Sequence, residues 1–342
     1  MNGLVLGLVS ALLFGASTPA SKVLLADLTP FQLAGLLYLG AALGVALPVA
    51  LERRRALRVR LDARNRARLA GAVFFGGVLG PVLLLMGLRT AAAASVSLIL
   101  NLEMAATAAL GAFVFREPLH RAGWIGVTGI VAAGALLSGE AGWPGVASGL
   151  LVAAACVCWG FDNHLTALID GITPATSTLV KGVAAGTTNL CIGAALAPVQ
   201  ASWPTAGAAL AVGAICYGAS ISLYIASAQQ LGATRAQGLF ASAPFFGAAL
   251  SFAVLGETPA PVHAAAGALL ALSVLLLFRS QHGHEHTHEA AVHIHSHRHD
   301  DGHHGHAHSD LPASTRHTHR HRHAPFAHAH PHWPDLHHRH RH

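Results

Sequence analysis

Residues 1–278 alternate between long apolar stretches and short breaks that carry charged residues or proline. A helix that crosses the hydrocarbon core of a bilayer needs roughly 20 mainly apolar residues. Ten stretches approach or reach this length, at residues 3–25, 31–51, 69–88, 91–115, 121–138, 145–167, 174–198, 206–228, 235–255 and 260–278. The pattern therefore predicts an all-α membrane protein with ten transmembrane helices.

The distribution of arginine predicts how these spans are oriented. Residues 52–68, between the second and third spans, hold eight arginines. Short cytoplasmic loops collect Lys and Arg, which places this loop inside the cell. Two spans precede the loop and eight follow it, so we expect an integral protein of the plasma (inner) membrane with both termini in the cytoplasm. An alternative role for the loop is the binding of anionic lipids.

The two halves of this apolar region also resemble each other. Residues 102–117 align with residues 242–257, and residues 14–30 align with residues 159–174 when one gap is allowed. Each repeat contains five spans, and because five is odd, the second repeat must enter the membrane from the opposite side. Inverted repeats of this kind are typical of secondary transporters, whose substrate site lies near the bilayer midplane.

These boundaries divide the chain into four parts. We expect a first repeat at 1–138, a linker at 139–144, a second repeat at 145–278 and a tail at 279–342. The fourth span of each repeat ends in an apolar run followed by glutamate and a turn with proline, as REP at 116–118 and GETP at 256–259.

This arrangement resembles the EamA domain, the duplicated unit of the drug/metabolite transporter (DMT) superfamily, over about residues 1–278. The resemblance implies a transporter rather than an enzyme. Members carry amino acids, nucleosides, sugars, other metabolites and drugs, and a few are similar to nickel/cobalt resistance proteins. The family often has a Glu-Pro pair in its fourth helix, whereas Glu103 lacks the proline and Pro244 lacks the glutamate. Lys181 occupies the place of an arginine early in the second helix of the unit, and residues 37–38 of the first repeat offer no such cation.

Polar side chains at membrane depth are costly, so they are candidates for a transport site. Glu103 lies near the middle of the fourth span and could bind a proton or a cation, and Asn101 lies two residues before it. Asp162 and His164, in the sixth span, are of the residue types that bind transition metals. Lys181, in the seventh span, could bind a substrate anion or act as a counter-charge. For each of them the alternative is a structural role, in helix–helix hydrogen bonds or in snorkelling of the long Lys181 side chain.

The tail differs in composition from the rest of the chain. Of the 26 histidines, 23 lie within residues 282–342, where large apolar residues are few, so we expect disorder. Neutral imidazole is the commonest metal ligand and suits nickel, cobalt and zinc. The candidate ligands are His282, His284, His286, His288, His293, His295, His297, His299, His303, His304, His306, His308, His317, His319, His321 and His323. No cofactor is expected beyond such a metal.

Composition narrows the function further. Charged residues make up 11% of the chain and mean hydropathy is +0.50, whereas soluble domains carry about 25% charged residues. The net charge of +6 depends on the arginine loop and does not indicate a nucleic-acid surface. We expect as partners the lipid bilayer and a small solute or metal ion, with a second copy of the chain, in a homodimer, as a further candidate.

Two functions fit the sequence best. The first is export of nickel, cobalt or zinc, with Glu103, Asp162 and His164 at the transport site and the tail capturing metal. The second is proton-coupled export of a metabolite or drug, with a tail that only senses or buffers metal. A membrane-anchored metal store that does not transport is a third alternative.

Overall fold

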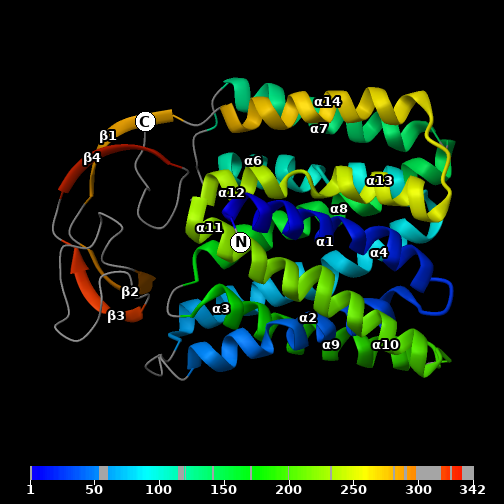
Figure 1. Cartoon of the computed structure of the whole chain (residues 1–342), viewed down its shortest axis with the longest axis horizontal. Helices are drawn as coiled ribbons and strands as arrows, with labels where there is room; N and C mark the ends of the chain where they lie inside the picture. Colours follow the sequence, from blue (N-terminus) through cyan, green and yellow to red (C-terminus); the bar gives the residue numbers. More distant parts are fainter. Residues whose placement is uncertain are drawn as a thin grey trace.

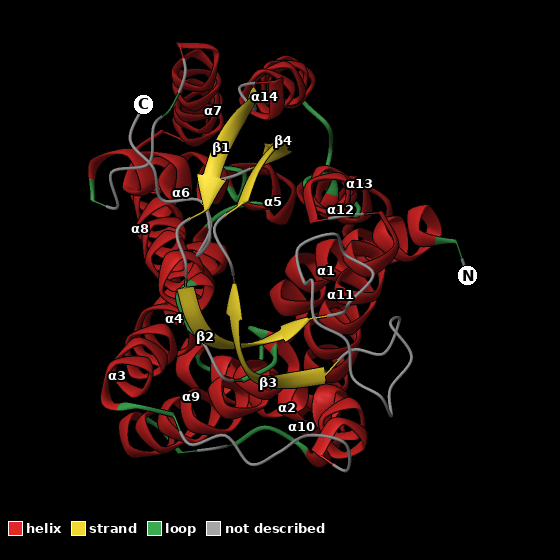
Figure 2. Cartoon of the chain, turned by 90° about the vertical axis from the view of Figure 1, so that its left-hand side faces the viewer, coloured by secondary structure: helices red, strands yellow, loops and turns green. Residues whose placement is uncertain are grey.

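The computed structural model describes residues 2–332 with the exception of 54–60, 115–118, 120, 141, 170–171, 199, 232, 280–281, 289–290, 298–316 and 324–325. Its body is a bundle of helices that run side by side, with α7 and α14 along one edge and α2, α9 and α10 along the opposite edge (Figure 1). Figure 2 shows the same bundle with the helices seen end-on.

Ten membrane spans can be followed through the described residues. Six are continuous helices: α1 (Gly3–Leu24), α2 (Pro30–Arg53), α7 (Arg121–Glu140), α8 (Gly142–Ala167), α9 (Pro174–Leu196) and α14 (Pro261–Arg279). The other four are composite: α3 (Ala63–Ala72), η1 (Val73–Leu79) and α4 (Gly80–Thr90); α5 (Ala93–Ile99) and α6 (Leu102–Phe113); α10 (Trp203–Val212), η2 (Gly213–Ala219) and α11 (Ser220–Leu231); α12 (Ala233–Phe240) and α13 (Ala243–Leu255). Nine spans are long and apolar enough to cross a bilayer, and Pro261–Leu277 is a shorter apolar helix. The predicted ten-span architecture is confirmed.

Polar caps explain where several of these helices begin. The side chains of Asp62, Thr173 and Ser202 accept hydrogen bonds from backbone amides of the first turns of α3, α9 and α10. Such residues satisfy amides that have no partner within the helix. Proline at the first position of α9 also fits, since that position needs no amide hydrogen.

The composite spans show the internal repeat in the structure itself. The segments η1 and η2 are both π-helical, and they begin at Val73 and Gly213, at equivalent places of the two repeats. The breaks at residues 100–101 and 241–242 interrupt the fourth and ninth spans at matching places. Discontinuous spans at corresponding positions of two inverted repeats point to a binding region near the midplane.

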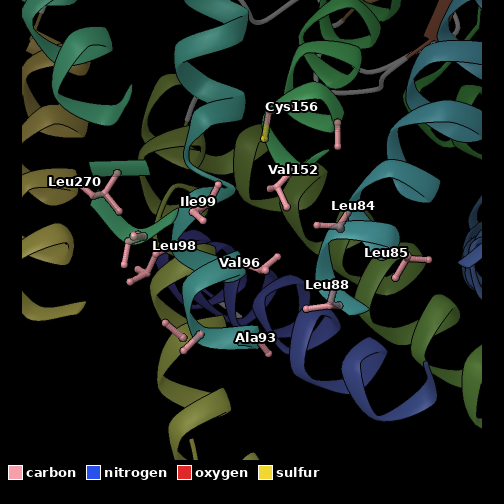
Figure 3. Close-up of a cluster of buried hydrophobic side chains, with 14 of the residues drawn as sticks. Leu84, Leu85, Leu88, Ala93, Val96, Leu98, Ile99, Val152, Cys156 and Leu270 are labelled. Atoms are coloured by element: carbon pink, nitrogen blue, oxygen red, sulfur yellow. The ribbon is translucent and has the colours of Figure 1, made fainter. Parts of the chain in front are cut away.

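A cluster of buried apolar side chains holds α5 against its neighbours (Figure 3). Val96, Leu98 and Ile99 of α5 belong to the same cluster as Leu85 and Leu88 of α4, with Val96 on the side of Leu88 and with Leu98 and Ile99 on the side of Leu270. Side chains from α8 and α14, among them Val152, Cys156 and Leu270, extend the cluster. Elsewhere many large apolar side chains are exposed on the outside of the bundle, as expected where helices face lipid.

Only short segments of the tail are described by the structure. Its described residues form β1 (His282–His288), β2 (Ala291–His297), β3 (His317–His323) and β4 (Phe326–His332). β1 pairs with β4 and β2 with β3, both antiparallel and in one continuous register that sets His282 opposite His332 and His297 opposite His317. Histidine at every second position has the two-residue period of a strand, and strand pairing satisfies backbone groups. His299, His303, His304, His306 and His308 lie outside the described residues.

Candidate functional site

Polar side chains of three other helices donate hydrogen bonds to backbone carbonyls of the π-helical segment η1. The carbonyl of Gly76 accepts hydrogen bonds from the hydroxyl of Tyr38 in α2 and from Nε1 of Trp159 in α8, the latter at 3.1 Å. The carbonyl of Gly77 accepts from Nδ2 of Asn189 in α9 at 3.0 Å. A π-helix changes the hydrogen-bond pattern of the backbone and is frequent at functional sites. Here α2, α8 and α9 meet at η1.

Beside η1 lies an ion pair between two of the predicted site residues. Nζ of Lys181 lies 2.6 Å from both carboxylate oxygens of Asp162, and Oγ1 of Thr166 donates to Oδ1 at 2.9 Å. The side chains are 16% and 10% exposed, so both charges are largely buried. A Cβ atom at Gly76 would overlap the Asp162 carboxylate. The glycine therefore makes room for the carboxylate against the backbone of η1.

Glu103 forms a separate polar contact between α6 and α8. It lies in the first turn of α6, directly after the break in the fourth span. Nδ2 of Asn163 donates to Oε1 of Glu103 at 3.0 Å and to Oγ1 of Thr107 at 3.2 Å. Nε2 of His164 hydrogen-bonds to the carbonyl of Thr107 at 3.0 Å.

Asn101 lies at the break itself. Its Nδ2 donates to the carbonyl of Leu98 at 3.0 Å, whereas its Oδ1 is buried without a hydrogen-bond partner among the described residues.

The structure thus brings Asp162 to Lys181 but does not gather Glu103, Asp162 and His164 into one ligand set. Within the described residues there is no group of three or more His, Cys, Asp or Glu side chains placed to hold a metal ion. Helical residues two apart point in different directions, which explains why Asp162 faces Lys181 while His164 faces α6.

Sequence reasoning missed several residues of this region. Asn163 and Asn189 were not singled out, although a buried amide within a span is the kind of signal that marked Asn101. Gly76 and Gly77 were also missed, and the glycine pair in the middle of an apolar span is the signal that could have found them. Lys22, near the end of α1, donates from its ammonium group to backbone carbonyls at the end of α4.

Comparisons with known proteins agree with the fold and its duplication. A curated relative from Methanothermobacter thermautotrophicus, described as an "Uncharacterized transporter", is 24% identical over 291 residues, which cover 79% of this chain and 84% of the relative. A solved crystal structure matches 80% of this chain and 96% of its own, with a TM-score of 0.57 and 20% identity, and supports the fold alone. Residues 1–139 and 147–279 each match the EamA-like transporter family. The chain therefore belongs to the EamA-like transporter family and is a multi-pass membrane transporter of the drug/metabolite type.

Proposed function

We propose that the chain is a proton-coupled exporter of a small organic solute that carries both an anionic and a cationic group, bound where α2, α8 and α9 meet η1. The observation that carries this proposal is the buried pair of Lys181 and Asp162, with both carboxylate oxygens at 2.6 Å from the ammonium group. The proposal places both termini in the cytoplasm, following the arginine-rich loop at 52–68.

The pair of Lys181 and Asp162 favours a solute with both charges, because a buried charge needs an opposite charge beside it throughout the transport cycle. Leaving one charge of a buried pair alone is strongly unfavourable. A solute with both charges can place its anionic group on Lys181 and its cationic group on Asp162. Both side chains then remain paired. The charges of Lys181 and Asp162 replace the water that surrounded the charged groups of the solute.

Glu103 is the proposed site of the coupling proton. Its carboxyl group is hydrogen-bonded by the neutral amide of Asn163, and it lies at the break in the fourth span. The other buried carboxylate of this region, Asp162, is held by the ammonium group of Lys181, which leaves Glu103 as the carboxyl proposed to bind the proton. One proton bound there from outside and released inside would drive one cycle of export.

The test uses purified protein in proteoliposomes with a zwitterionic amino acid, a dicarboxylate and a diamine as probes. We expect the zwitterion alone to be transported, and Asp162→Asn or Lys181→Met to abolish its transport. Thr188→Ala, on an exposed position of the same helix α9, is the matched control and should leave transport unchanged. Transport of the dicarboxylate or the diamine with equal efficiency would contradict the proposed substrate class.

Coupling is tested separately with Glu103→Gln. This variant should no longer accumulate solute in response to a pH gradient but should still exchange solute across the membrane without one. Loss of both activities would assign Glu103 to solute binding instead.

A second candidate is export of nickel, cobalt or zinc, supported by the histidine tail. The strand register sets histidine opposite histidine at six positions: 282 and 332, 284 and 330, 286 and 328, 293 and 321, 295 and 319, and 297 and 317. Imidazole is a suitable ligand for zinc and nickel. In either candidate function we propose that the tail binds divalent metal, with an affinity that falls as the imidazoles become protonated below about pH 6.5.

Metal content of cells separates the two candidates. The full chain, a chain that ends at Arg279, and the Glu103→Gln and Asp162→Asn variants are expressed in metal-sensitive cells. If the tail only senses or buffers metal, truncation alone changes metal content. If metal content also changes with both variants in the body, then metal is the exported solute and the zwitterion proposal is wrong.

A further inference from the structure

The hairpin between α4 and α5 is bound by a side chain from the end of α1. Nζ of Lys22, near the end of α1, donates to the carbonyls of Leu88, Arg89 and Ala91 at 2.7, 3.2 and 2.9 Å. The last carbonyls of a helix have no partner within the helix and carry its negative dipole end. A single ammonium group from the first repeat therefore satisfies the end of α4.

The first turn of α5 is held by residues of the other repeat. The carboxylate of Glu257, just after α13, accepts hydrogen bonds from the amides of Ala93 at 2.7 Å and Ala94 at 2.8 Å. Nε2 of His263, in α14, is 3.0 Å from Oγ of Ser95. Hydrogen bonds from amides to a carboxylate are among the strong ones, and a negative charge suits a helix N-terminus.

The His263 ring can be assigned from its second contact. The amide of Ala260 donates to Nδ1 at 3.1 Å, so the proton of the neutral ring lies on Nε2 and is donated to Ser95. Glu257 and His263 together supply three hydrogen bonds from the second repeat to consecutive residues of the first.

This contact is polar and stands beside a void. A cavity of about 460 Å³ is lined by Ser95, Glu257 and His263 together with residues of α7 and α8. The deeper turns of α5, by contrast, contribute Val96, Leu98 and Ile99 to the apolar cluster of Figure 3. Hydrogen bonds thus hold the first turn of this short helix, whereas apolar contacts hold the rest of it.

Two buried polar atoms in and directly after α5 lack a hydrogen-bond partner among the described residues. Oγ of Ser97 and Oδ1 of Asn101, in residues that are 1% exposed, have no hydrogen-bond partner within the part of the chain that the structure describes. Buried polar groups are nearly always paired, and leaving them unpaired is unfavourable. A second position of α5 that pairs them would offset part of the cost of breaking the contacts at its first turn.

We propose that Glu257, assisted by His263 and Lys22, forms a latch that keeps the α4–α5 end of the transport pathway closed. Inverted-repeat transporters expose their site to one side at a time by moving parts of the two repeats against each other. Contacts that join the repeats at one end must break when that end opens. The three hydrogen bonds to Ala93, Ala94 and Ser95 join the repeats at this end. Glu257 is a positioning residue of this transporter, and its role as a latch rests on the alternating access of the proposed function.

Native cysteines report on the latch without any substrate. Cys156, Cys158 and Cys216 are buried within the bundle, whereas Cys191 is exposed and is replaced by alanine in all variants. Each variant is placed in lipid nanodiscs, where both ends are accessible, and is treated with a charged maleimide. Labelling of each thiol over time is measured by mass spectrometry.

We expect Glu257→Gln to raise the labelling rate of at least one buried thiol several-fold. The amide of glutamine keeps the shape of the side chain but has only one oxygen for the two backbone amides. Asp62→Asn is the matched control: Asp62 accepts a hydrogen bond from the amide of Asn65 within the first repeat, and asparagine caps a helix as well as aspartate, so the labelling rates should not change. Glu257→Asp, which keeps the charge, should give a smaller rise.

Two results would overturn the latch. If Glu257→Gln lowers the melting temperature but leaves labelling as in the control, Glu257 is a fixed cap of α5. If Glu257→Gln does not fold, His263→Gln provides the same measurement, and labelling equal to the control there contradicts the proposal. Both results are independent of which solute is transported, so a wrong substrate class and a wrong latch can be told apart.

Discussion

The segments η1 and η2 share the same irregular backbone, at equivalent places of the two repeats, but differ in what surrounds them. Around η1, donors from Tyr38, Trp159 and Asn189 meet backbone carbonyls, and a buried ion pair lies alongside. Around η2, the backbone of α2 lies so close that a Cβ at Gly213 would overlap the carbonyl of Leu37. One segment forms a polar site and the other a tight helix contact.

The positions of glycine account for this difference. In η1, Gly76 leaves space for the carboxylate of Asp162, and Gly77 leaves space for Ala185 and the stem of Lys181. The corresponding residues of η2 are Cys216 and Tyr217, whereas its glycines stand at positions 213 and 218 and face α2. Small residues allow membrane helices to approach closely. Two inverted repeats can therefore keep one backbone plan while only one of them carries charged side chains.

Replacing Lys181, the cation beside η1, should cause the largest loss of stability among the changes that test this comparison. Lys181→Met leaves the buried Asp162 carboxylate unpaired, and breaking a buried pair costs about 3–5 kcal/mol. The double variant Asp162→Asn with Lys181→Met should regain most of that stability but not transport. Unfolding in detergent measures the stability of both variants against the unchanged protein. Equal stability of the single and double variants would show that the pair does not contribute.

Closing the space at η2 should come next. In Gly40→Ala, the added methyl group would overlap the backbone carbonyl of Leu210, which cannot rotate away. Overpacking of this kind costs typically about 1–3 kcal/mol. The control is Gly207→Ala on α10, where a Cβ meets no atom within 4 Å. If the two variants melt at the same temperature, the contact between α2 and η2 is looser than described.

Replacing Gly76 of η1 by cysteine, the residue at the corresponding position of η2, tests whether this glycine is needed for the polar site. Gly76→Cys would place a side chain where the Asp162 carboxylate lies, which should pull the carboxylate away from Lys181. Loss of a charge-assisted hydrogen bond costs about 1.5–3 kcal/mol, partly recovered here because the carboxylate can rotate. We expect transport to be lost while the protein still folds. Gly267→Ala, in open space on α14, is the control, and unchanged transport in Gly76→Cys would exclude the proposed role of this space.

The smallest effect is expected for one donor at η1. Tyr38→Phe removes the hydroxyl that binds the Gly76 carbonyl, but Trp159 still donates to the same atom. The loss should be about 0.5–1.5 kcal/mol in unfolding measurements. A loss larger than that of Lys181→Met would mean that Tyr38, not the ion pair, organises this region.

Much of the fold could be predicted from the apolar pattern, because a span must be long, apolar and helical to satisfy its backbone in lipid. The fourth span was expected at 91–115 and is found as α5 and α6 within 93–113. The break inside it was not predicted, since residues 100–101 are an ordinary Leu-Asn pair without proline or glycine. The tail was expected to lack regular structure, and its described strands rest on pairing between segments that are distant from each other in the chain.

The sequence by itself determined the ten spans, the correspondence between the two repeats and which ionisable residues lie at membrane depth. These follow from composition and periodicity, which act locally along the chain. Only the tertiary structure decided that Asp162 pairs with Lys181, that Glu103 meets Asn163, and that Glu257 holds α5. Each of these contacts joins residues of different elements of the fold, so each depends on how the helices pack and on where glycine lets a side chain approach a neighbouring backbone.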